Sequence, residues 1–336
     1  MKIKSILTSL GLALCIQNAS ADVKPEDLIR TEDQTYLTIP EWYLVHSPNE
    51  YADYLGDQRA PSQFPFAKHI GQFWDTYYQS HMITKDKYPF NLEYHIMVAT
   101  IGVSTTVEYT MKGLYESFVG SVTEYDSYTT PEDKYASKIS KDYVEFIKID
   151  PWYKFDFMSA VKGLWTETEF FGPHFIRKLE RKYSLTTEYL VKAGYASLIK
   201  YATGAAFTPP VPYSSVLING NLDNYTSNIV LLTNKDGNDL LRLPRYGEFT
   251  VNLVELAKEE KDFIEICGNK TKITVAILPP VDFDITTYKS KVFINQPIYT
   301  NPKIKRIIYE VEIKDLGAML RDLNKRNIKI EHIYDF

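Results

Sequence analysis

Residues 92–122 read LEYHIMVATIGVSTTVEYTMKGLYESFVGSV, the longest apolar stretch of the chain after its N-terminus. The stretch contains no proline, and no acidic or basic side chain lies between Glu93 and Glu108. In an α-helix, side chains three and four positions apart lie on one face, and this stretch sorts its residues at that spacing. It therefore predicts one long helix, around which the rest of the N-terminal half is arranged.

Wound as a helix, residues 92–122 present three different faces. The first is a stripe of small side chains that begins with one histidine: His95, Ala99, Gly102, Thr106, Thr110, Gly113 and Ser117. The second is a charged row of Glu108, Lys112 and Glu116, in which neighbours spaced by four can pair. The third is apolar. Small residues let another helix backbone approach closely, so we expect the stripe to pack against residues 186–206, which are equally rich in small side chains.

The apolar part of this stretch is short for a membrane span. As a helix, the charge-free residues 94–107 extend about 21 Å, whereas a bilayer core needs roughly 20 apolar residues. A longer span would place Glu108 and Lys112 in hydrocarbon, which is costly. We therefore favour a buried core helix, and membrane association through 92–122 and 186–206 is the alternative.

Residues 1–21 have the pattern of a secretory signal peptide. Lys2 and Lys4 form a basic start, residues 6–16 are apolar, and Ala19-Ser20-Ala21 is a small-residue cleavage site. An uncleaved anchor would begin in the same way. We expect cleavage after Ala21, and hence an exported protein of the periplasm or cell envelope.

Charge and cysteine content narrow the classes of function. Removal of residues 1–21 takes away two lysines and no acid, which changes the net charge from −5 to −7. Such a chain does not suit a nucleic-acid partner or electrostatic attraction to anionic lipid. Cys267 is then the single cysteine left, so no internal disulfide forms. Packing must hold the core, and 26 Tyr and 17 Phe are available for it.

Residues 22–206 read as a mostly helical, aromatic-rich domain. Ser47-Pro48 and Thr130-Pro131 each have a capping side chain followed by proline, which is typical of the start of a helix. Pro209, Pro210 and Pro212 then disfavour both helix and central strand. We assign residues 207–224 to a proline-rich linker.

Residues 225–336 change from helical periodicity to short strands between two helices. The helices are expected at 249–260 and 315–326, each with apolar residues on one side. Two strand–helix–strand units with added antiparallel strands predict a ferredoxin-like α+β sandwich. The whole chain is therefore assigned to the α+β class.

Three phrases of the chain resemble a known group of sequences: PEWYLVHSPNEYADYL, FPFAKHIGQFW and YHIMVATIGVSTTVEYTMKGLYE. The group consists of bacterial exported or membrane-associated proteins of uncharacterised function, and the resemblance spans most of the chain. It implies a shared build and a location at the cell envelope. It supplies no activity, cofactor or catalytic residue.

The sequence contains none of the common reaction motifs, such as GxSxG, HExxH, paired CxxC, a P-loop or GxGxxG. The candidate ligand-binding residues are His69, Asp75, His95, Glu108 and Lys112. A metal or acid–base cluster would form if two helices face each other, from His69, Asp75, His81, Glu93 and His95. No metal-ligand spacing singles these residues out. We predict no metal site and no cofactor. Glu108 with Lys112 suits a structural ion pair.

Two functions remain open. The favoured one is a non-enzymatic envelope protein that binds lipid, an apolar small molecule or an envelope protein. The alternative is an enzyme of unlisted type that uses the region around His69, His95 and Glu108. The two differ in geometry, because an enzyme needs these three side chains in one pocket, whereas structural residues each have a partner of their own.

Overall fold

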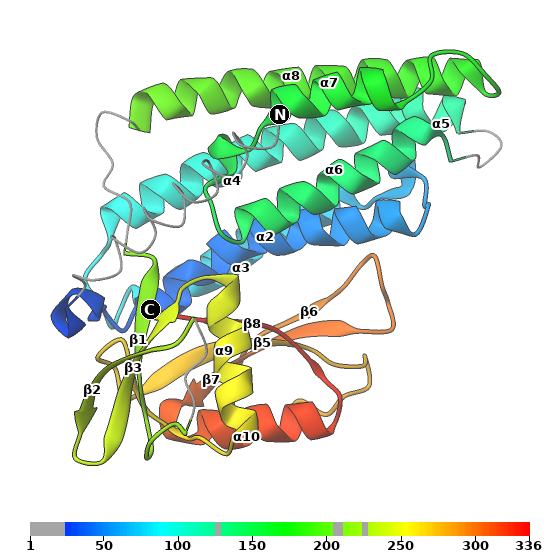
Figure 1. Ribbon diagram of the computed structural model, residues 1–336. Coiled ribbons are helices and arrows are strands. Elements are labelled where there is room, and N and C mark those ends of the chain that lie inside the picture. Colours follow the sequence, from blue (N-terminus) through cyan, green and yellow to red (C-terminus); the bar gives the residue numbers. More distant parts are fainter. Residues whose placement is uncertain (1–23, 125–128, 204–210, 224–227) are drawn as a thin grey trace.

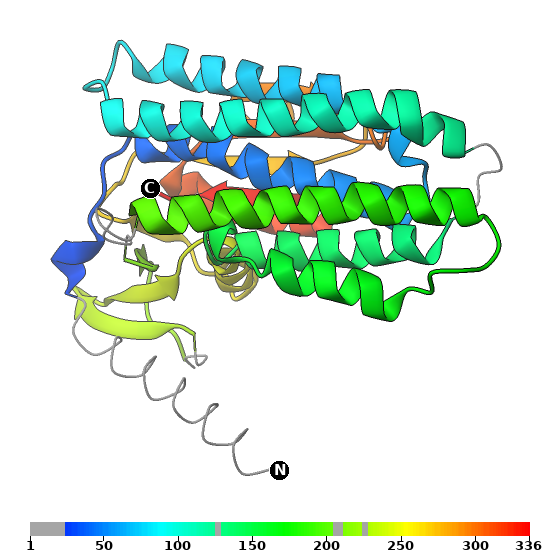
Figure 2. The same cartoon turned by 90° about the horizontal axis from the view of Figure 1, so that it is seen from above.

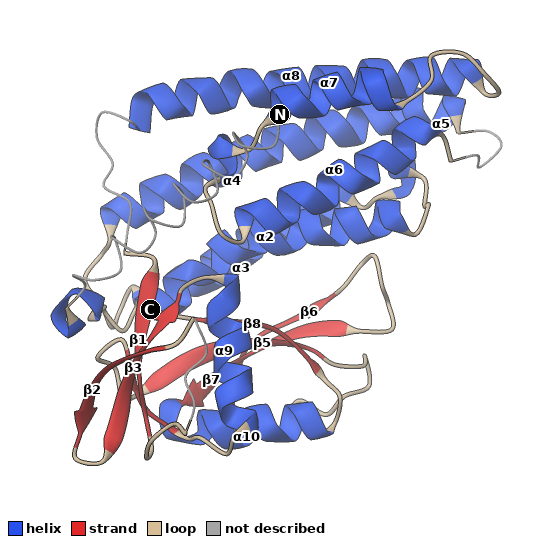
Figure 3. Ribbon diagram, in the orientation of Figure 1, coloured by secondary structure: helices blue, strands red, loops and turns tan. Residues whose placement is uncertain are grey.

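The computed structural model describes residues 24–124, 129–203, 211–223 and 228–336. The predicted signal peptide, residues 1–21, lies outside the described residues. Helices come first in the chain and strands follow, so the α+β class is confirmed. Figure 1 and Figure 3 show the helices stacked on one side of the molecule and the strands, with two further helices, on the other.

The helical part contains six long helices. They are α2 (Gln34–Gly56), α3 (Phe66–Thr84), α4 (Leu92–Tyr115), α6 (Pro131–Ile147), α7 (Phe157–Glu167) and α8 (Phe175–Thr203). The short elements are η1 (Pro25–Leu28), η2 (Pro61–Gln63), the π-helix η3 (Glu116–Gly120), α5 (Ser121–Thr123) and η4 (Trp152–Lys154). The predicted start at Thr130-Pro131 is confirmed, because Thr130 and Asp133 form a capping box.

The predicted helix start at Ser47-Pro48 is wrong, because α2 is one helix that continues through Pro40 and Pro48. A proline inside a helix removes a backbone hydrogen bond. Here that loss is outweighed by packing, since α2 buries side chains on several of its sides along its whole length. Ser47 caps nothing, and its hydroxyl instead lies among the side chains of neighbouring helices.

The α+β part contains two four-stranded antiparallel sheets with the same topology. The first unit is β1 (Tyr213–Ile218), β2 (Val230–Lys235), β3 (Asn238–Pro244), α9 (Gly247–Lys258) and β4 (Phe263–Ile266), with strand order β2-β3-β1-β4. The second is β5 (Lys272–Leu278), β6 (Lys291–Pro297), β7 (Lys305–Glu312), α10 (Ile313–Lys325) and β8 (Lys329–Tyr334), with order β6-β7-β5-β8. The ferredoxin-like topology is not confirmed, since the strands divide into two sheets that repeat one pattern.

One apolar core joins the two sheets to α9 and α10. It includes Val216 and Leu241 of the first sheet, Val275 and Tyr309 of the second, and Leu320 of α10. Strand β1 lies inside the range 207–224 that the sequence indicated as linker. It begins directly after Pro212. The predicted linker therefore includes a strand of the first sheet.

The helical part and the α+β part share a buried interface. The first half of α2 packs on the sheet β6-β7-β5-β8, where Ile39 and Trp42 contact Ile308 and other apolar side chains. The Trp42 ring also stacks on His332, with 3.5 Å between the ring centroids. Helix α2 therefore belongs to the cores of both parts.

The expected packing of the small-residue stripe against residues 186–206 is wrong. A Cβ on Gly102 would lie 2.2 Å from Cε1 of Phe73, and one on Gly113 would lie 3.3 Å from Cβ of Phe66, so the stripe faces α3. Gly194, in α8, has open space around it. The stripe accepts large aromatic rings of α3 because small side chains leave room for them.

The favoured interpretation of residues 92–122 as a buried core helix is confirmed for one side only, where Tyr94, Val98 and Tyr109 are buried. Val107 and Met111 are 58% and 64% exposed, and the other apolar side chains on their side of α4 are exposed to solvent as well. The faces were predicted from helical periodicity, but periodicity does not say which face meets the interior. The exposed side and the hidden side of this helix carry different kinds of side chain.

Candidate functional site

The exposed side of α4 and its continuation through α5 is apolar along its length. Its exposed side chains form one row: Ile96, Val103, Val107, Met111, Leu114, Phe118 and Val122. Phe118 is 74% exposed. Within residues 96–122, all of which the structure describes, the charged side chains are turned away: Glu116 is buried, and Glu108 and Lys112 are partly buried.

Helix α8 has the same inverted arrangement. It exposes Ile176, Leu179, Tyr183, Leu190, Val191 and Leu198, and it buries Arg177, Lys178, Glu180, Arg181 and Lys182. Figures 1 and 2 show α4 and α8 on the side of the molecule away from the sheets, and both are uncovered when seen from above. We call the exposed apolar side chains of these two helices the outer face.

An aromatic cluster lies where α7 turns into α8. Phe171 of the connecting loop is 73% exposed, and Trp165, Phe170 and Phe175 are each between 39% and 47% exposed. The Phe171 and Phe175 rings stack with centroids 5.9 Å apart, and Trp165 stacks on Phe170 at 6.2 Å. We call these four residues the aromatic loop.

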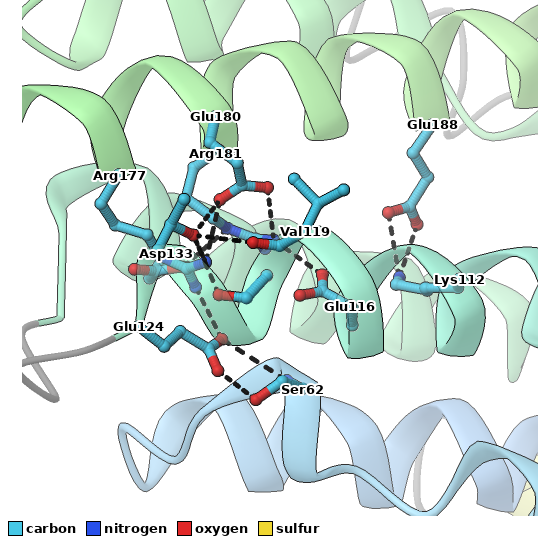
Figure 4. A network of polar contacts seen from close by, with 12 residues as sticks. Ser62, Lys112, Glu116, Val119, Glu124, Asp133, Arg177, Glu180, Arg181 and Glu188 are labelled. Carbon is cyan, nitrogen blue, oxygen red and sulfur yellow. Dashed lines mark hydrogen bonds and ion pairs between the residues drawn. The ribbon is translucent and has the colours of Figure 1, made fainter.

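Behind the outer face lies a buried ionic network, drawn in Figure 4. Arg181 of α8 reaches Glu116 of η3 at 2.8 Å and Asp133 of α6 at 2.8 Å. Arg177 contacts Glu180 and Glu124, each at 2.9 Å. The Arg181 side chain is 1% exposed, so these charges face each other rather than water.

A second group of charges continues the network along α4 and α8. Lys112 Nζ lies 2.9 Å from Glu188, and Lys192 Nζ lies 2.8 Å from Glu108 and 2.9 Å from Glu188. Burial by itself would raise the pKa of Glu188, but the ammonium groups of Lys112 and Lys192 hold that pKa well below its ordinary range. The carboxylate is therefore ionised at any pH near neutrality.

The network explains why α4 and α8 can turn their charges inward. An unpaired buried charge costs several kcal/mol, whereas a pair with good geometry offsets much of that cost. Each basic side chain of the network meets at least one carboxylate within 4.0 Å. The helices thus hold a polar interior and an apolar exterior, the reverse of the usual amphipathic helix of a water-soluble protein.

A different buried polar cluster lies between α2 and α3. Ser47 Oγ is 2.8 Å from His69 Nδ1, and His69 Nε2 is 3.6 Å from a carboxylate oxygen of Glu50. Arg306 Nη2 of β7 donates to Glu50 at 2.8 Å and also to Glu331 of β8 at 2.7 Å. The cluster therefore ties the helical part to the second sheet.

Serine, histidine and glutamate in a row are the residue types of acyl transfer, but this row is not suited to that chemistry. Ser47 is 2% exposed. Burial, and then the guanidinium of Arg306, lowers the pKa of His69 to about 3, which makes it a weak base at neutral pH. The adjacent cavity of about 10 Å³ has room for one water. We interpret the row as a hydrogen-bonded part of the core.

The five candidate residues from the sequence do not converge on one site. His69 lies beside Ser47. His95 Nδ1 is 2.9 Å from the Tyr77 hydroxyl. Asp75 is exposed and accepts a hydrogen bond from Gln79 at 2.7 Å. Glu108 and Lys112 belong to the ionic network, each paired with a residue of α8.

The candidate histidines do not share a pocket. His69 and His95 line two separate cavities. In the described ranges, no group of three or more His, Cys, Asp or Glu side chains is placed to hold a metal ion.

Sequence reasoning missed the partners in α8. Arg177, Lys178, Arg181 and Lys182 follow each other at one, three and one positions, a spacing that places them on one face of a helix. Ile176, Leu179 and Tyr183 lie on the opposite face. The two faces were therefore readable, but a basic helix face is usually assigned to solvent.

Comparison with protein-family models, with curated proteins and with solved structures finds no match for this chain. The resemblance noted in the sequence thus stays a prediction. Among the helices that the structure describes, none combines the length and the apolar character that crossing a bilayer demands.

Proposed function

We propose that this chain is a non-enzymatic protein of the cell envelope that binds an apolar partner through the outer face. One observation carries the proposal: α4 and α8 expose their apolar rows and bury their charges. A soluble protein rarely exposes a contiguous apolar patch of more than a few hundred Å², and larger patches mark binding sites.

The size of the effect supports the same reading. Burying one Val, Leu, Ile or Phe side chain stabilises by about 1.5–3 kcal/mol. The outer face leaves a row of such side chains exposed on each helix. Burying these side chains would release on the order of 10 kcal/mol of free energy that is not gained while the face is in water. An apolar partner would recover part of this free energy.

The enzymatic alternative has less support. His69, His95 and Glu108 each end in a partner of their own, and Ser47 is buried beside a histidine of low basicity. These contacts are those of structural residues. We therefore propose binding rather than catalysis.

Export is the second part of the proposal. It rests on Lys2, Lys4, the apolar residues 6–16 and the Ala19-Ser20-Ala21 site. Intact-mass measurement of the native protein tests it. A mature chain that begins at Asp22 supports export and cleavage, whereas a chain that still carries residues 1–21 would mean an anchor.

The binding role is tested by charging the outer face. The face variant Val107→Glu/Leu114→Glu/Val191→Glu changes three side chains that are 51–66% exposed. The matched control is Val251→Glu, since Val251 is an apolar side chain of α9 that is 60% exposed. All proteins are compared in detergent-free buffer by anilinonaphthalene sulfonate fluorescence and by sedimentation.

We expect the wild type and the control to bind the probe and to self-associate unless detergent is present. The face variant should lose most of the probe signal and sediment as a monomer, with an unchanged circular dichroism spectrum. A wild type that is monomeric without detergent and binds no more probe than the face variant would contradict the proposed function.

A further inference from the structure

We propose that the partner of the outer face is lipid: α4 and α8 lie flat in the interfacial region of a bilayer, and the aromatic loop inserts beside them. This inference rests on the proposed function and deepens it. Three observations carry it, and a fourth indicates how the helices lie.

The first is the extent of the uncharged surface. From Ile96 to Val122 the most exposed charged side chain is that of Glu108, at 38%, and it pairs with Lys192. In α8 from Phe175 to Leu198 every charged residue is buried or partly buried. At ~1.5 Å per residue these rows extend about 40 Å and 35 Å. A protein interface has a polar rim around a smaller apolar centre. Two uncharged rows of this length fit a continuous apolar medium better.

The second is the state of the hydroxyl groups on these rows. Thr100 donates to the carbonyl of Ile96 at 2.7 Å, Ser121 to that of Ser117 at 2.6 Å, and Ser197 to that of Ala193 at 2.8 Å. Each hydroxyl is exposed yet bonded within its own helix. Hydrocarbon offers no hydrogen-bond partner, so polar groups that meet it must be satisfied internally.

The third is the aromatic loop at one end of α8. Phe171 is its most exposed ring, and the buried Lys178 donates to the carbonyl of Phe171 at 2.9 Å. This bond holds the loop in place while its rings project. Trp and Phe side chains are typical of the apolar side of segments that bind at the surface of a bilayer, and a fixed loop loses little conformational freedom on insertion.

The fourth concerns orientation. No described helix is long and apolar enough to cross the bilayer, and α7, next to α8, exposes Lys162 and Glu167. Helices with one apolar side lie in the plane of the membrane and bury that side about 5–10 Å deep. The charged residues of α7 then remain at the level of the headgroups.

The chain has a net charge of −5. Four basic side chains of α8, those of Arg177, Arg181, Lys182 and Lys192, pair with carboxylates inside the molecule. Binding is therefore driven by apolar contact and not by attraction to anionic headgroups. Zwitterionic vesicles should suffice, and salt should not release the protein, because salt screens charges and leaves apolar contact intact.

The test is flotation of the purified full chain with phosphatidylcholine vesicles in low and in high salt. The proteins are the wild type, the face variant, the loop variant Phe170→Ser/Phe171→Ser and the control Val251→Glu. Residues 6–16 are apolar too, so the decisive comparison is between variants that all carry them.

We expect the wild type and the control to float equally at both salt concentrations. The face variant should bind at least tenfold more weakly, and the loop variant several-fold more weakly. Equal flotation of wild type and face variant would overturn the inference, as would binding that requires anionic lipid and is lost in high salt.

The outcomes also separate this inference from the proposed function. If the wild type binds the apolar probe but not vesicles, the proposed function stands and the inference of a lipid partner is overturned. If it then forms a dimer that the face variant abolishes, a second copy covers the face. A wild type that binds neither probe nor vesicles overturns both.

Discussion

Helices α10 and α8 are built from the same kind of pattern and are placed in opposite ways. Helix α10 buries Leu316, Leu320 and Leu323 in the core of the α+β part and exposes Lys314 and Asp315. Helix α8 buries its arginines and lysines and exposes Ile176, Leu179 and Tyr183. The same period of apolar and charged residues thus serves a helix that buries its apolar side and a helix that exposes it.

Under the proposed function, the difference means that the two parts of the chain are matched to different surroundings. The α+β part hides most of its apolar side chains from solvent, which suits water on its outside. The outer layer of the helical part hides its charges in pairs, which costs free energy unless its apolar outside is covered. Equivalent changes made in the two parts test this contrast.

The largest loss of stability is expected when a charge is placed on the apolar side of α10, and the same change on the apolar side of α4 is the comparison. Leu320→Asp puts a carboxylate into the core of α10, where Leu320 is 1% exposed, and should lower the free energy of unfolding by more than about 4 kcal/mol. Leu114→Asp changes a side chain that is 51% exposed, so in mild detergent it should cost less than about 0.5 kcal/mol. Chemical unfolding followed by circular dichroism measures both. Equal losses would mean that Leu114 is not on an outer face.

The sequence supported the class of the fold because local signals decide it. The capping box at Thr130 and the apolar side of residues 315–326 are each set by neighbouring residues, and both agree with the structure. The continuity of α2 through Pro48 was not predictable in this way, since tertiary packing outweighs the local signal. Nor was strand β1 within the supposed linker, because its partners β3 and β4 lie further along the chain.

The candidate site was predictable only in part, for a related reason. Periodicity located the row of Glu108, Lys112 and Glu116, and pairing between neighbours of that row was the natural expectation. The structure pairs them instead with Lys192, Glu188 and Arg181 of α8. A sequence gives the faces of each helix, but which faces meet depends on the arrangement of all helices together.

The second prediction breaks the ionic network. Arg181→Met leaves Glu116 and Asp133 without their shared guanidinium in a buried site, and removing one partner of a buried pair typically costs 3–5 kcal/mol. We expect a loss of about that size in thermal or chemical unfolding. Lys200→Met, which changes an exposed lysine of the same helix, is the control and should cost less than about 0.5 kcal/mol.

A double variant tests whether Arg181 and Glu116 stabilise the protein as a pair. Arg181→Met combined with Glu116→Gln removes one of the stranded charges, so the double variant should regain part of the lost stability. If the double variant is as unstable as the sum of two independent losses, the pair does not act as the structure indicates.

The third prediction concerns pH at the interface between the two parts. Burial lowers the pKa of His46 to about 4, against the opposing effect of the Glu331 carboxylate, and the pKa of His69 is about 3. The unfolded chain, with ordinary histidines, therefore binds more protons below about pH 6.5. Stability should fall as pH decreases from about 7 to 5, by up to about 2 kcal/mol per histidine.

Buried carboxyl groups with a raised pKa oppose this loss: burial raises the pKa of Glu41 to about 7. Burial raises the pKa of Glu50, so the folded state takes up that proton more readily and gains stability as pH falls. Urea unfolding at several pH values measures the slope. His69→Gln should flatten it. A slope that is the same in the wild type and in this variant would show that His69 does not carry the effect.

The last prediction compares two glycines in the two helices of the outer layer. Gly102 faces α3, and a Cβ there would lie 2.2 Å and 2.5 Å from atoms of the Phe73 ring. Because Phe73 is itself buried, the ring has no free space into which to move, and Gly102→Ala should cost about 1–3 kcal/mol through overpacking. Alanine is also the better helix former by up to ~1 kcal/mol, which reduces the net loss.

Gly194 of α8 is the matched position, because a Cβ added there would meet no other atom within 4 Å. Gly194→Ala should therefore stabilise the protein by about 0.4–1 kcal/mol, since alanine restricts the unfolded chain and clashes with nothing in the folded one. Thermal unfolding in detergent compares the two variants. If Gly102→Ala stabilises the protein and Gly194→Ala destabilises it, the packing of the stripe on α3 is refuted. The stripe would then pack against α8, as the sequence predicted.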